Sequence, residues 1–407
     1  WAPFFSGGLG VNIHNYEFLK GNEMVNKLKV RASYGRTGKA SFPAYAATTM
    51  YEALFDEWYA TGFGAVLKAL GNNNLTWEKT DKFNVGIEMQ FLNRRLTVDA
   101  DYYHDKTIDL VNDVSLSQTS GFSSYKDNMG EVLNQGFELQ VRGEVFRNRD
   151  WLVALWGNMA HNKNKILKIS DSQRAYNQRV KEFYENIVNE EYGRYNSKYG
   201  VPISQYEEGQ SLTSIWAVKS LGIDPTTGKE IFLNRDGSVS DTWNATQEVA
   251  VGNTEPKFNG SIGFNAAYKQ WSLFAAFQYE WGGQEYNQTL VDRVENARIQ
   301  YQNVDLRVLT DRWKQPGDIA QFKDIKNADS ATMPTSRFVQ DKAYLRLSAL
   351  TLSYDFNREW IKKYLGMNML RLEASTRDFI NWNSIRQERG LSYPKSWTVD
   401  FSIKAQF

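Results

Sequence analysis

The last eleven residues, Trp397-Thr398-Val399-Asp400-Phe401-Ser402-Ile403-Lys404-Ala405-Gln406-Phe407, decide the fold class. Apolar and polar side chains alternate throughout. Because successive side chains of a β-strand point to opposite faces, this period of two predicts a strand with one apolar and one polar face. Ten steps of about 3.4 Å, tilted by about 45°, span roughly 24 Å, close to the apolar band of about 25 Å in outer-membrane barrels. The stretch therefore predicts a membrane-spanning strand with an aromatic residue near each interface.

The same alternation recurs along the whole chain, which predicts an all-β protein. It runs through residues 28–34, 83–91, 96–102, 137–145, 258–268, 271–281, 350–356 and 370–376. Between residues 344 and 356 the apolar face switches by one position, so we expect a β-bulge near Ala349.

The lengths of the connections indicate how these strands are arranged. Three of them, 91–96, 145–151 and 268–271, are very short, whereas 36–82, 105–135, 162–210 and 282–342 are long. Short turns that alternate with long loops place all long loops at one end, as in barrels with periplasmic turns and extracellular loops. We therefore predict a transmembrane antiparallel β-barrel. Residues 173–195 carry apolar side chains at helical spacing, so one loop is expected to contain an amphipathic helix.

Composition agrees with this class and excludes others. Aromatic residues make up 14% of the 407 residues although the mean hydropathy is polar, a combination typical of two-faced strands in lipid. The net charge of +1 argues against nucleic acid as a partner, because phosphate contacts need excess Lys and Arg. The chain has no cysteine, which excludes disulfides, thiolate catalysis and cysteine metal sites.

Signatures of catalysis and cofactor binding are missing from the sequence. It contains no G-x-S-x-G, Walker A or G-x-G-x-x-G motif, and its three histidines lack metal-ligand spacing. Residues 224–229, DPTTGK, lack the full ligand series of a calcium loop and predict a tight turn. We expect no enzymatic activity, no catalytic residue, no cofactor and no metal.

Aromatic residues in or beside the long connections are the candidates for substrate binding. Flat rings flanked by Asn, Asp and Gln suit sugar rings or peptide side chains. The alternative is that these rings pack the loops together or form the interfacial belt. The candidates are Trp58, Tyr59, Trp216, Trp243, Trp281 and Tyr286.

Two further features concern assembly and the lumen. A final amphipathic strand that ends in Phe407 is typical of the signal read by the outer-membrane barrel assembly machinery, although an ordinary edge strand could also end this way. On the strand 137–145, Glu138, Gln140, Arg142 and Glu144 share the polar face and are expected to line the lumen.

Several stretches, in order along the chain, resemble SusC/RagA-like TonB-dependent outer-membrane transporters. They are SGGLGVNI at 6–13, LKVRASYG at 28–35, LTWEKT at 75–80, NMGEVLNQGFEL at 128–139, DLR at 305–307, DRW at 311–313, PGD at 316–318, SRFVQD at 336–341 and YLRL at 344–347. Each is modest alone, and their order makes them specific.

The resemblance implies a 22-stranded barrel in the cell outer membrane, closed around an N-terminal plug that a TonB box precedes. It also implies import of oligosaccharides or oligopeptides powered through TonB, with a SusD-like surface lipoprotein as a lid. Two transporter–lid pairs can associate as a dimer. Residues 1–407 show no plug, TonB box or signal peptide, so we expect a C-terminal portion of the barrel with roughly a dozen strands.

Two alternatives remain open at this point. One is a TonB-dependent siderophore or cobalamin receptor built on the same barrel. The other is a secreted β-rich carbohydrate-binding or adhesin protein, in which the apolar strand faces would be buried in a sandwich.

Overall fold

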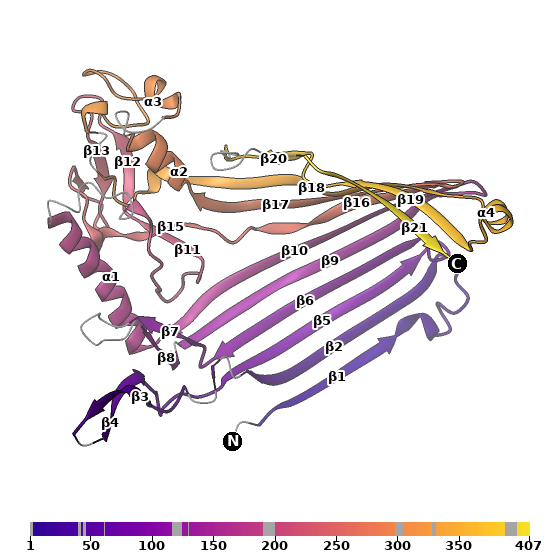
Figure 1. Ribbon diagram of the computed structural model, residues 1–407, viewed down its shortest axis with the longest axis horizontal. Helices are drawn as coiled ribbons and strands as arrows, with labels where there is room; N and C mark the ends of the chain where they lie inside the picture. Colours follow the sequence, from indigo (N-terminus) through magenta and orange to yellow (C-terminus); the bar gives the residue numbers. More distant parts are fainter. Residues whose placement is uncertain are drawn as a thin grey trace.

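The computed structural model describes residues 3–39, 42–43, 46–60, 62–115, 124–128, 130–189, 200–297, 304–327, 331–386 and 397–407. Strands dominate, and a single large antiparallel sheet carries most of them (Figure 1). No helix among these residues is long and apolar enough to cross a membrane.

The large sheet is a continuous meander that ends in two edge strands, β1 and β21. Each strand pairs with the next along the path, and the short β20 (Asn381–Asn383) pairs with β18. Figure 1 shows the sheet as a broad wall that curves over between β10 and β18. The path runs through β1 (Phe5–Asn12), β2 (Val25–Lys39), β5 (Glu78–Phe91), β6 (Leu96–Ile108), β9 (Gly130–Arg147), β10 (Trp151–Ile169), β16 (Phe258–Tyr268), β17 (Trp271–Tyr286), β18 (Val339–Asp355), β19 (Met369–Thr376) and β21 (Val399–Gln406). The prediction of roughly a dozen antiparallel strands is confirmed.

The register assigns every strand position to one of two faces, because directly paired residues lie on the same side of a sheet. Phe401 pairs with Ala374, Ala374 with Leu352, and Leu352 with Leu273. We call this apolar side the outer face and the opposite side, which carries Asp400 and Ser402, the inner face. On β9 the inner face carries Glu138, Gln140, Arg142 and Glu144, as predicted for the lumen.

The predicted bulge near Ala349 is confirmed. Ala349 pairs with Ala276 and Leu347 with Phe277, so Ser348 is the extra residue. Its hydroxyl donates to the carbonyl oxygen of Ala276 at 3.0 Å. The bulge returns the apolar side chains of both halves of β18 to the outer face.

The two ends of the sheet differ as predicted. Short turns and the helix α4 (Arg358–Leu365) lie at one end, on the right in Figure 1, and the long connections lie at the other. Helix α4 was not predicted from the sequence. The side-chain oxygen of Asn357 accepts hydrogen bonds from the backbone N–H groups of Glu359 and Trp360 and caps its start, and Gly366 ends it in the left-handed conformation. One long connection is longer than predicted. The sequence predicted a connection over residues 162–210, whereas β10 ends at Ile169 and the chain returns to the wall only at Phe258, where β16 begins.

The long connections form a loop layer with its own small elements. The helix predicted at 173–195 is α1 (Asp171–Asn189), and the rest of that range lies outside the described residues. Hydrophobic core clusters lie in this layer, one of them around Val291, Val294 and Phe338. The other elements are β3 (Met50–Tyr59), β4 (Gly62–Ala69), β7 (Val111–Ser115), β8 (Ser124–Asn128), β11 (Ser214–Ala217), β12 (Lys219–Ile223), β13 (Glu230–Leu233), β14 (Val239–Ser240), β15 (Val249–Asn253), α2 (Gln288–Leu290) and α3 (Arg307–Thr310).

Candidate functional site: the polar wall and its mouth

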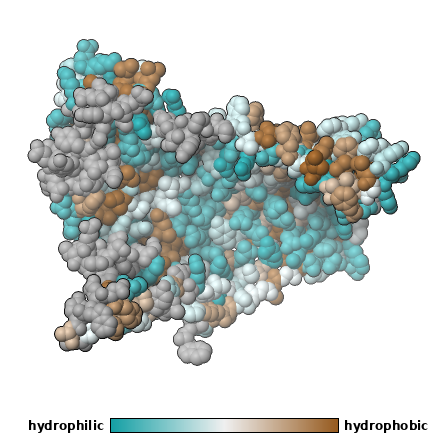
Figure 2. All heavy atoms as spheres, in the orientation of Figure 1, coloured by the Kyte–Doolittle hydropathy of each residue, from teal (hydrophilic) through white to brown (hydrophobic). Residues whose placement is uncertain are grey.

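The inner face of the wall is a field of paired charges. Glu88 on β5 accepts hydrogen bonds from Lys27 at 2.6 Å and Lys29 at 3.4 Å, both on β2. Arg31 on β2 forms a two-pronged ion pair with Asp101 on β6, at 2.6 and 2.8 Å. Figure 2 shows hydrophilic side chains across the middle of the sheet. This face can line a water-filled passage, which the apolar outer face cannot.

Two glycines give these inner side chains room to cross a strand. Arg31 and Asp101 reach each other over Gly86, where a Cβ would lie 2.8 Å from Arg31 Nε and closer still to the Asp101 carboxylate. At Gly136 a Cβ would lie 1.9 Å from the carbonyl oxygen of His161 and 2.7 Å from the hydroxyl of Tyr103. Tyr103 thus crosses β9 and donates to Asn162 Oδ1 at 2.9 Å. The glycine in the NQGFEL stretch is explained by this close approach.

Aromatic rings mark both edges of the outer face. Near the loop layer, Phe137, His161 and Phe258 lie with ring centroids 5.4 to 6.4 Å apart, and Trp281 continues the row at 6.4 Å from Phe258. At the turn end, Trp151 contacts Tyr268 at 4.4 Å, and Trp271 contacts Tyr354 at 4.8 Å. Rings of this kind at two heights are the girdles that bound the lipid-facing band of a barrel.

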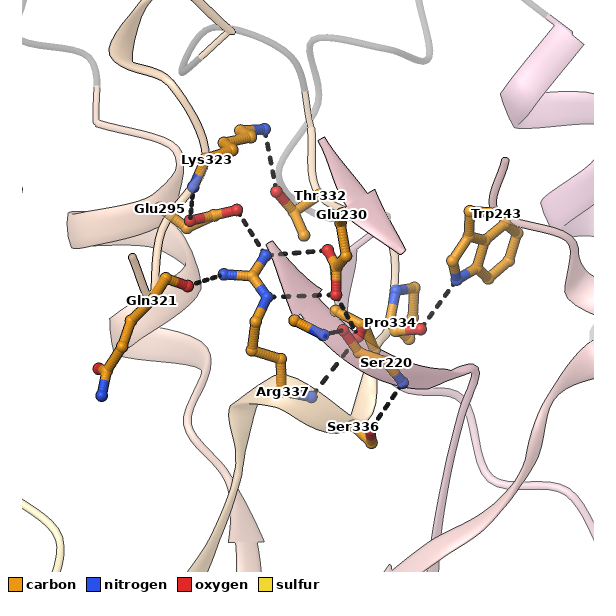
Figure 3. Close-up of polar contacts among 12 residues, drawn as sticks. Ser220, Glu230, Trp243, Glu295, Gln321, Lys323, Thr332, Pro334, Ser336 and Arg337 are labelled. Carbon is orange, nitrogen blue, oxygen red and sulfur yellow. Dashed lines mark hydrogen bonds and ion pairs between the residues drawn. The ribbon is translucent and has the colours of Figure 1, made fainter. Parts of the chain in front are cut away.

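A buried charged cluster holds the loop layer together (Figure 3). Arg337 donates from Nη2 to Glu230 at 2.9 Å and to Glu295 at 2.6 Å, and from Nε to Glu230 at 3.2 Å. Glu230 also accepts from the Thr335 hydroxyl at 2.6 Å, and Glu295 is fully buried. One arginine therefore joins β13, the segment after α2, and the start of β18.

Electrostatics explain why this cluster stays charged. Burial lowers the pKa of the Arg337 guanidinium, but the carboxylates of Glu295 and Glu230 outweigh burial and hold that pKa above its ordinary value. Nearby, burial lowers the pKa of Lys323 to about 8. The Lys323 ammonium donates to Thr332 at 3.0 Å and Asn296 at 3.2 Å.

The DRW stretch at 311–313 also holds parts of the loop layer together. Arg312 donates to the carbonyl oxygens of Glu295 at 3.0 Å and Lys323 at 2.9 Å. The indole of Trp313 donates to Pro225 O at 2.8 Å. Pro225 lies in the 224–229 segment, where Gly228 N donates to Asp224 O at 2.8 Å, so the predicted tight turn is confirmed.

A polar cleft of about 1050 Å³ lies where β16 begins, between β10 and β17. Its walls come from residues 161–164 of β10, 281–284 of β17, 341–343 of β18 and the loop segments 209–214 and 250–257. The side-chain oxygen of Asn164 accepts a hydrogen bond from Leu212 N at 2.8 Å, and its amide nitrogen donates to Asn134 Oδ1 at 2.7 Å. Carboxamides and a half-open volume of this size can hold a polar ligand.

The structure separates the six aromatic candidates. Trp216 is 1% exposed, and Tyr286 is partly buried, with its ring edge-on to Phe338 at a centroid distance of 6.0 Å. Trp243 donates its indole N–H to Pro334 O at 2.9 Å. These three rings fit the loop-packing alternative better than a surface for substrate.

Trp281 alone among the candidates with described side chains lines the cleft, and it is 67% exposed. Trp58 and Tyr59 belong to β3, but their side chains lie outside the described residues, so their role stays a prediction. Phe407 follows β21 and is exposed, and its role in assembly also stays a prediction. Among the described residues, no group of three metal-ligating side chains is present.

Comparison with known proteins decides the family. Residues 4–375 match the sequence model of the TonB dependent receptor-like β-barrel family. The chain belongs to this family. It is therefore an outer-membrane β-barrel protein of a family of receptors and transporters rather than enzymes, and the alternative of a secreted sandwich is excluded.

Relatives within the TonB-dependent receptor family support the SusC/RagA resemblance. The chain is 32% identical over 180 residues to TonB-dependent receptor SusC of Bacteroides thetaiotaomicron. The aligned region covers 42% of this chain and 18% of SusC. It is 26% identical over 389 residues to TonB-dependent receptor P3 of Formosa agariphila, covering 94% of this chain and 37% of P3. The chain thus spans less than half the length of these TonB-dependent receptors.

Solved structures show the same fold. A RagAB peptide importer in its "open-open" state superposes with a TM-score of 0.76 at 22% identity, covering 99% of this chain and 42% of that chain. The RagAB peptide transporter superposes with a TM-score of 0.74 at 22% identity, covering 94% of this chain and 40% of that one. At 22% identity, this likeness shows the fold alone.

Proposed function

We propose that this chain forms part of the wall and of the extracellular mouth of a TonB-dependent importer of oligosaccharides or oligopeptides. The observation that carries the proposal is the polar inner face, whose ion pairs continue into carboxamides such as Asn162 and Asn164 at the mouth. An inner wall with many hydrogen-bonding groups offers a polar oligomer several weak binding sites in succession. The oligomer can therefore pass without binding too tightly at any one of them. One of the structures with the same fold, RagAB, is a peptide importer, which agrees with the oligopeptide class.

We propose further that elements outside this chain complete the machine. Among the described residues, β1 and β21 each have one unpaired edge. An open edge cannot face lipid, because its backbone groups would lack partners. Additional wall strands, a plug with its TonB box, and a SusD-like lipoprotein over the loop layer follow from this reasoning and from the relatives, as does a dimer of transporter–lid pairs.

The proposal is tested by growth of a deletion strain on defined nutrients. Cells that lack the full-length protein should fail to grow on one class of oligosaccharide or oligopeptide and should recover when the gene is restored. Loss of TonB should give the same defect. A defect confined to ferric chelates or cobalamin would favour the siderophore or cobalamin receptor instead.

The lid is tested separately by detergent purification of the native complex. A surface lipoprotein should copurify with the full-length protein in equal amounts. Repeated recovery of the barrel alone, in a detergent that preserves its band shift on unheated gels, would contradict the lid and leave the importer proposal standing.

A further inference from the structure

We propose that the polar cleft beside Trp281 binds the phosphorylated sugar headgroup of an outer-leaflet glycolipid. This inference needs only the membrane location of the barrel and does not depend on what the barrel transports. It rests on the height of the cleft, on two basic residues without ion partners, and on the aromatic and amide groups beside them.

The cleft lies at the upper edge of the lipid-facing band. Its lining includes His161 and Trp281, which belong to the aromatic row of the outer face near the loop layer. Lys163 follows His161 by two positions on β10 and therefore lies on the same face. The headgroups of the outer leaflet lie at this height, because such girdles mark the boundary between hydrocarbon and headgroups.

Two exposed lysines of the cleft form no ion pair with a described residue. Among the residues that the structure describes, neither Lys163 nor Lys257 has an ion pair. Some basic residues elsewhere on the wall are paired, as Arg36 is with Asp81 at 2.6 Å and Lys106 with Glu131 at 2.8 Å. Two free lysines at the headgroup level would attract phosphate.

Two carboxylates of the lining, Glu255 and Asp341, keep their negative charge, but they form their hydrogen bonds with neutral amide groups and not with Lys163 or Lys257. Glu255 accepts hydrogen bonds from the side chain of Asn162 and, at 3.3 Å, from the backbone N–H of Asn164. Asp341 accepts from Gln284 at 3.2 Å. The third lysine in the lining, Lys342, is paired with Glu285 at 3.0 Å.

The rest of the lining suits a sugar. Gly282 has φ +80°, and a Cβ there would lie 2.9 Å from the stem of Lys257, so this stem packs directly on the backbone beside Trp281. The exposed indole offers a flat face for a pyranose ring, and Gln210 and Ser211 line the same space with hydroxyl and amide groups. A phosphorylated glycolipid combines all three chemistries, whereas a simple phospholipid lacks the ring for Trp281.

The experiment uses the full-length protein in nanodiscs and titrates purified bisphosphorylated lipid A, with dephosphorylated lipid A as the comparison. Lys163→Ala/Lys257→Ala should weaken binding roughly 30-fold, since each basic residue near an anionic surface contributes about a factor of five. Lys163→Arg/Lys257→Arg should keep most of the affinity. Lys314→Ala/Lys326→Ala removes the same charge from exposed loop positions outside the cleft and should bind like wild type.

A band shift on unheated gels verifies that each variant is folded. Equal affinity for the dephosphorylated glycolipid, or an unchanged affinity in the folded Lys163→Ala/Lys257→Ala variant, would overturn the proposal. Tighter binding of a soluble phosphorylated oligosaccharide than of the glycolipid would also overturn it, because the cleft would then be a substrate site.

Discussion

At the residue scale, the side of a strand on which a side chain lies decides whether it meets lipid or water. Phe401 and Ser402 are neighbours in β21, yet Phe401 lies on the outer face with Ala374 and Ser402 on the inner face with Glu373. Phe401 is 82% exposed, which is costly in water and favourable in lipid. Exposure of large apolar side chains is therefore a sign of the membrane here rather than of an unfinished core.

Replacing Phe401 by Arg tests this assignment. We expect Phe401→Arg to destabilise the barrel by about 2–4 kcal/mol, because an arginine near the bilayer midplane must leave water. Ser402→Arg introduces the same residue one position away, on the inner face, and should cost much less. Urea unfolding in lipid vesicles measures both, and equal losses would contradict the assignment of the two faces.

Gly136 provides a second test at this scale. We expect Gly136→Ala to cost about 1–3 kcal/mol, because its methyl group would collide with the His161 carbonyl and the Tyr103 hydroxyl. Gly143 lies on the same strand, where a Cβ would meet only Leu96 Cδ1 at 3.7 Å. Gly143→Ala should therefore stay within about 0.5 kcal/mol of wild type. The same unfolding measurement compares the two variants, and a similar cost for both would refute the close approach.

At the scale of elements, the wall and the loop layer are stabilised differently. The wall has a ladder of backbone hydrogen bonds with lipid on one side and water on the other, so its strands need no packed core. The loop layer has a packed core, and Arg337 connects its parts. Damage to the loop core should leave the wall intact.

Arg337→Ala tests this separation. It would leave the buried Glu295 without its guanidinium partner, and we expect a local loss of about 3–5 kcal/mol in the loop layer. Limited proteolysis should cut the loops of this variant far faster, while the band shift on unheated gels stays unchanged. Arg235→Ala removes a partly exposed arginine and its pair with Glu207, and should have a smaller effect. Loss of the band shift in Arg337→Ala would contradict the independence of the wall.

Glu248 gives the loop layer a pH dependence. Burial raises the pKa of its carboxyl to about 7, partly offset by the hydrogen bond from Gln205. The folded state then binds the proton more tightly than the unfolded state, whose pKa is about 4.3. The contribution of protonated Glu248 to the stability of the loop layer is fully present at pH values below about 4.3 and is lost as the pH rises through about 7. Loops should therefore resist proteolysis better at pH 5.5 than at pH 8.

Glu248→Gln is the control for this effect. A neutral amide cannot ionise, so the difference in loop proteolysis between pH 5.5 and pH 8 should shrink in this variant. The protease must be one whose rate on an unfolded substrate is matched at the two pH values. An undiminished difference would mean that another group causes the pH dependence.

The elements differ in how far the sequence predicts them. The wall strands were predictable because lipid on one side and water on the other impose a period of two, and even the bulge at Ser348 left a visible switch of faces. The charged cluster was not predictable, since Glu230 and Arg337 lie 107 positions apart and no local pattern connects them. The aromatic candidates could not be separated from the sequence, because loop packing decides that Trp216 is buried and Trp281 is exposed.

At the scale of the whole molecule, the chain is a wall with a polar interior, an apolar exterior and a structured mouth at one end (Figure 1). We propose that such a wall lets polar oligomers cross lipid while energy supplied through TonB opens the way.

The most direct measurement is accumulation of a fluorescent oligomer in the periplasm of cells that carry the full-length protein. The oligomer is chosen from the class that supports growth. Accumulation should require both the protein and TonB, whereas surface binding should persist when TonB is removed. Accumulation that continues at the same rate without TonB, as in a passive pore, would contradict the account.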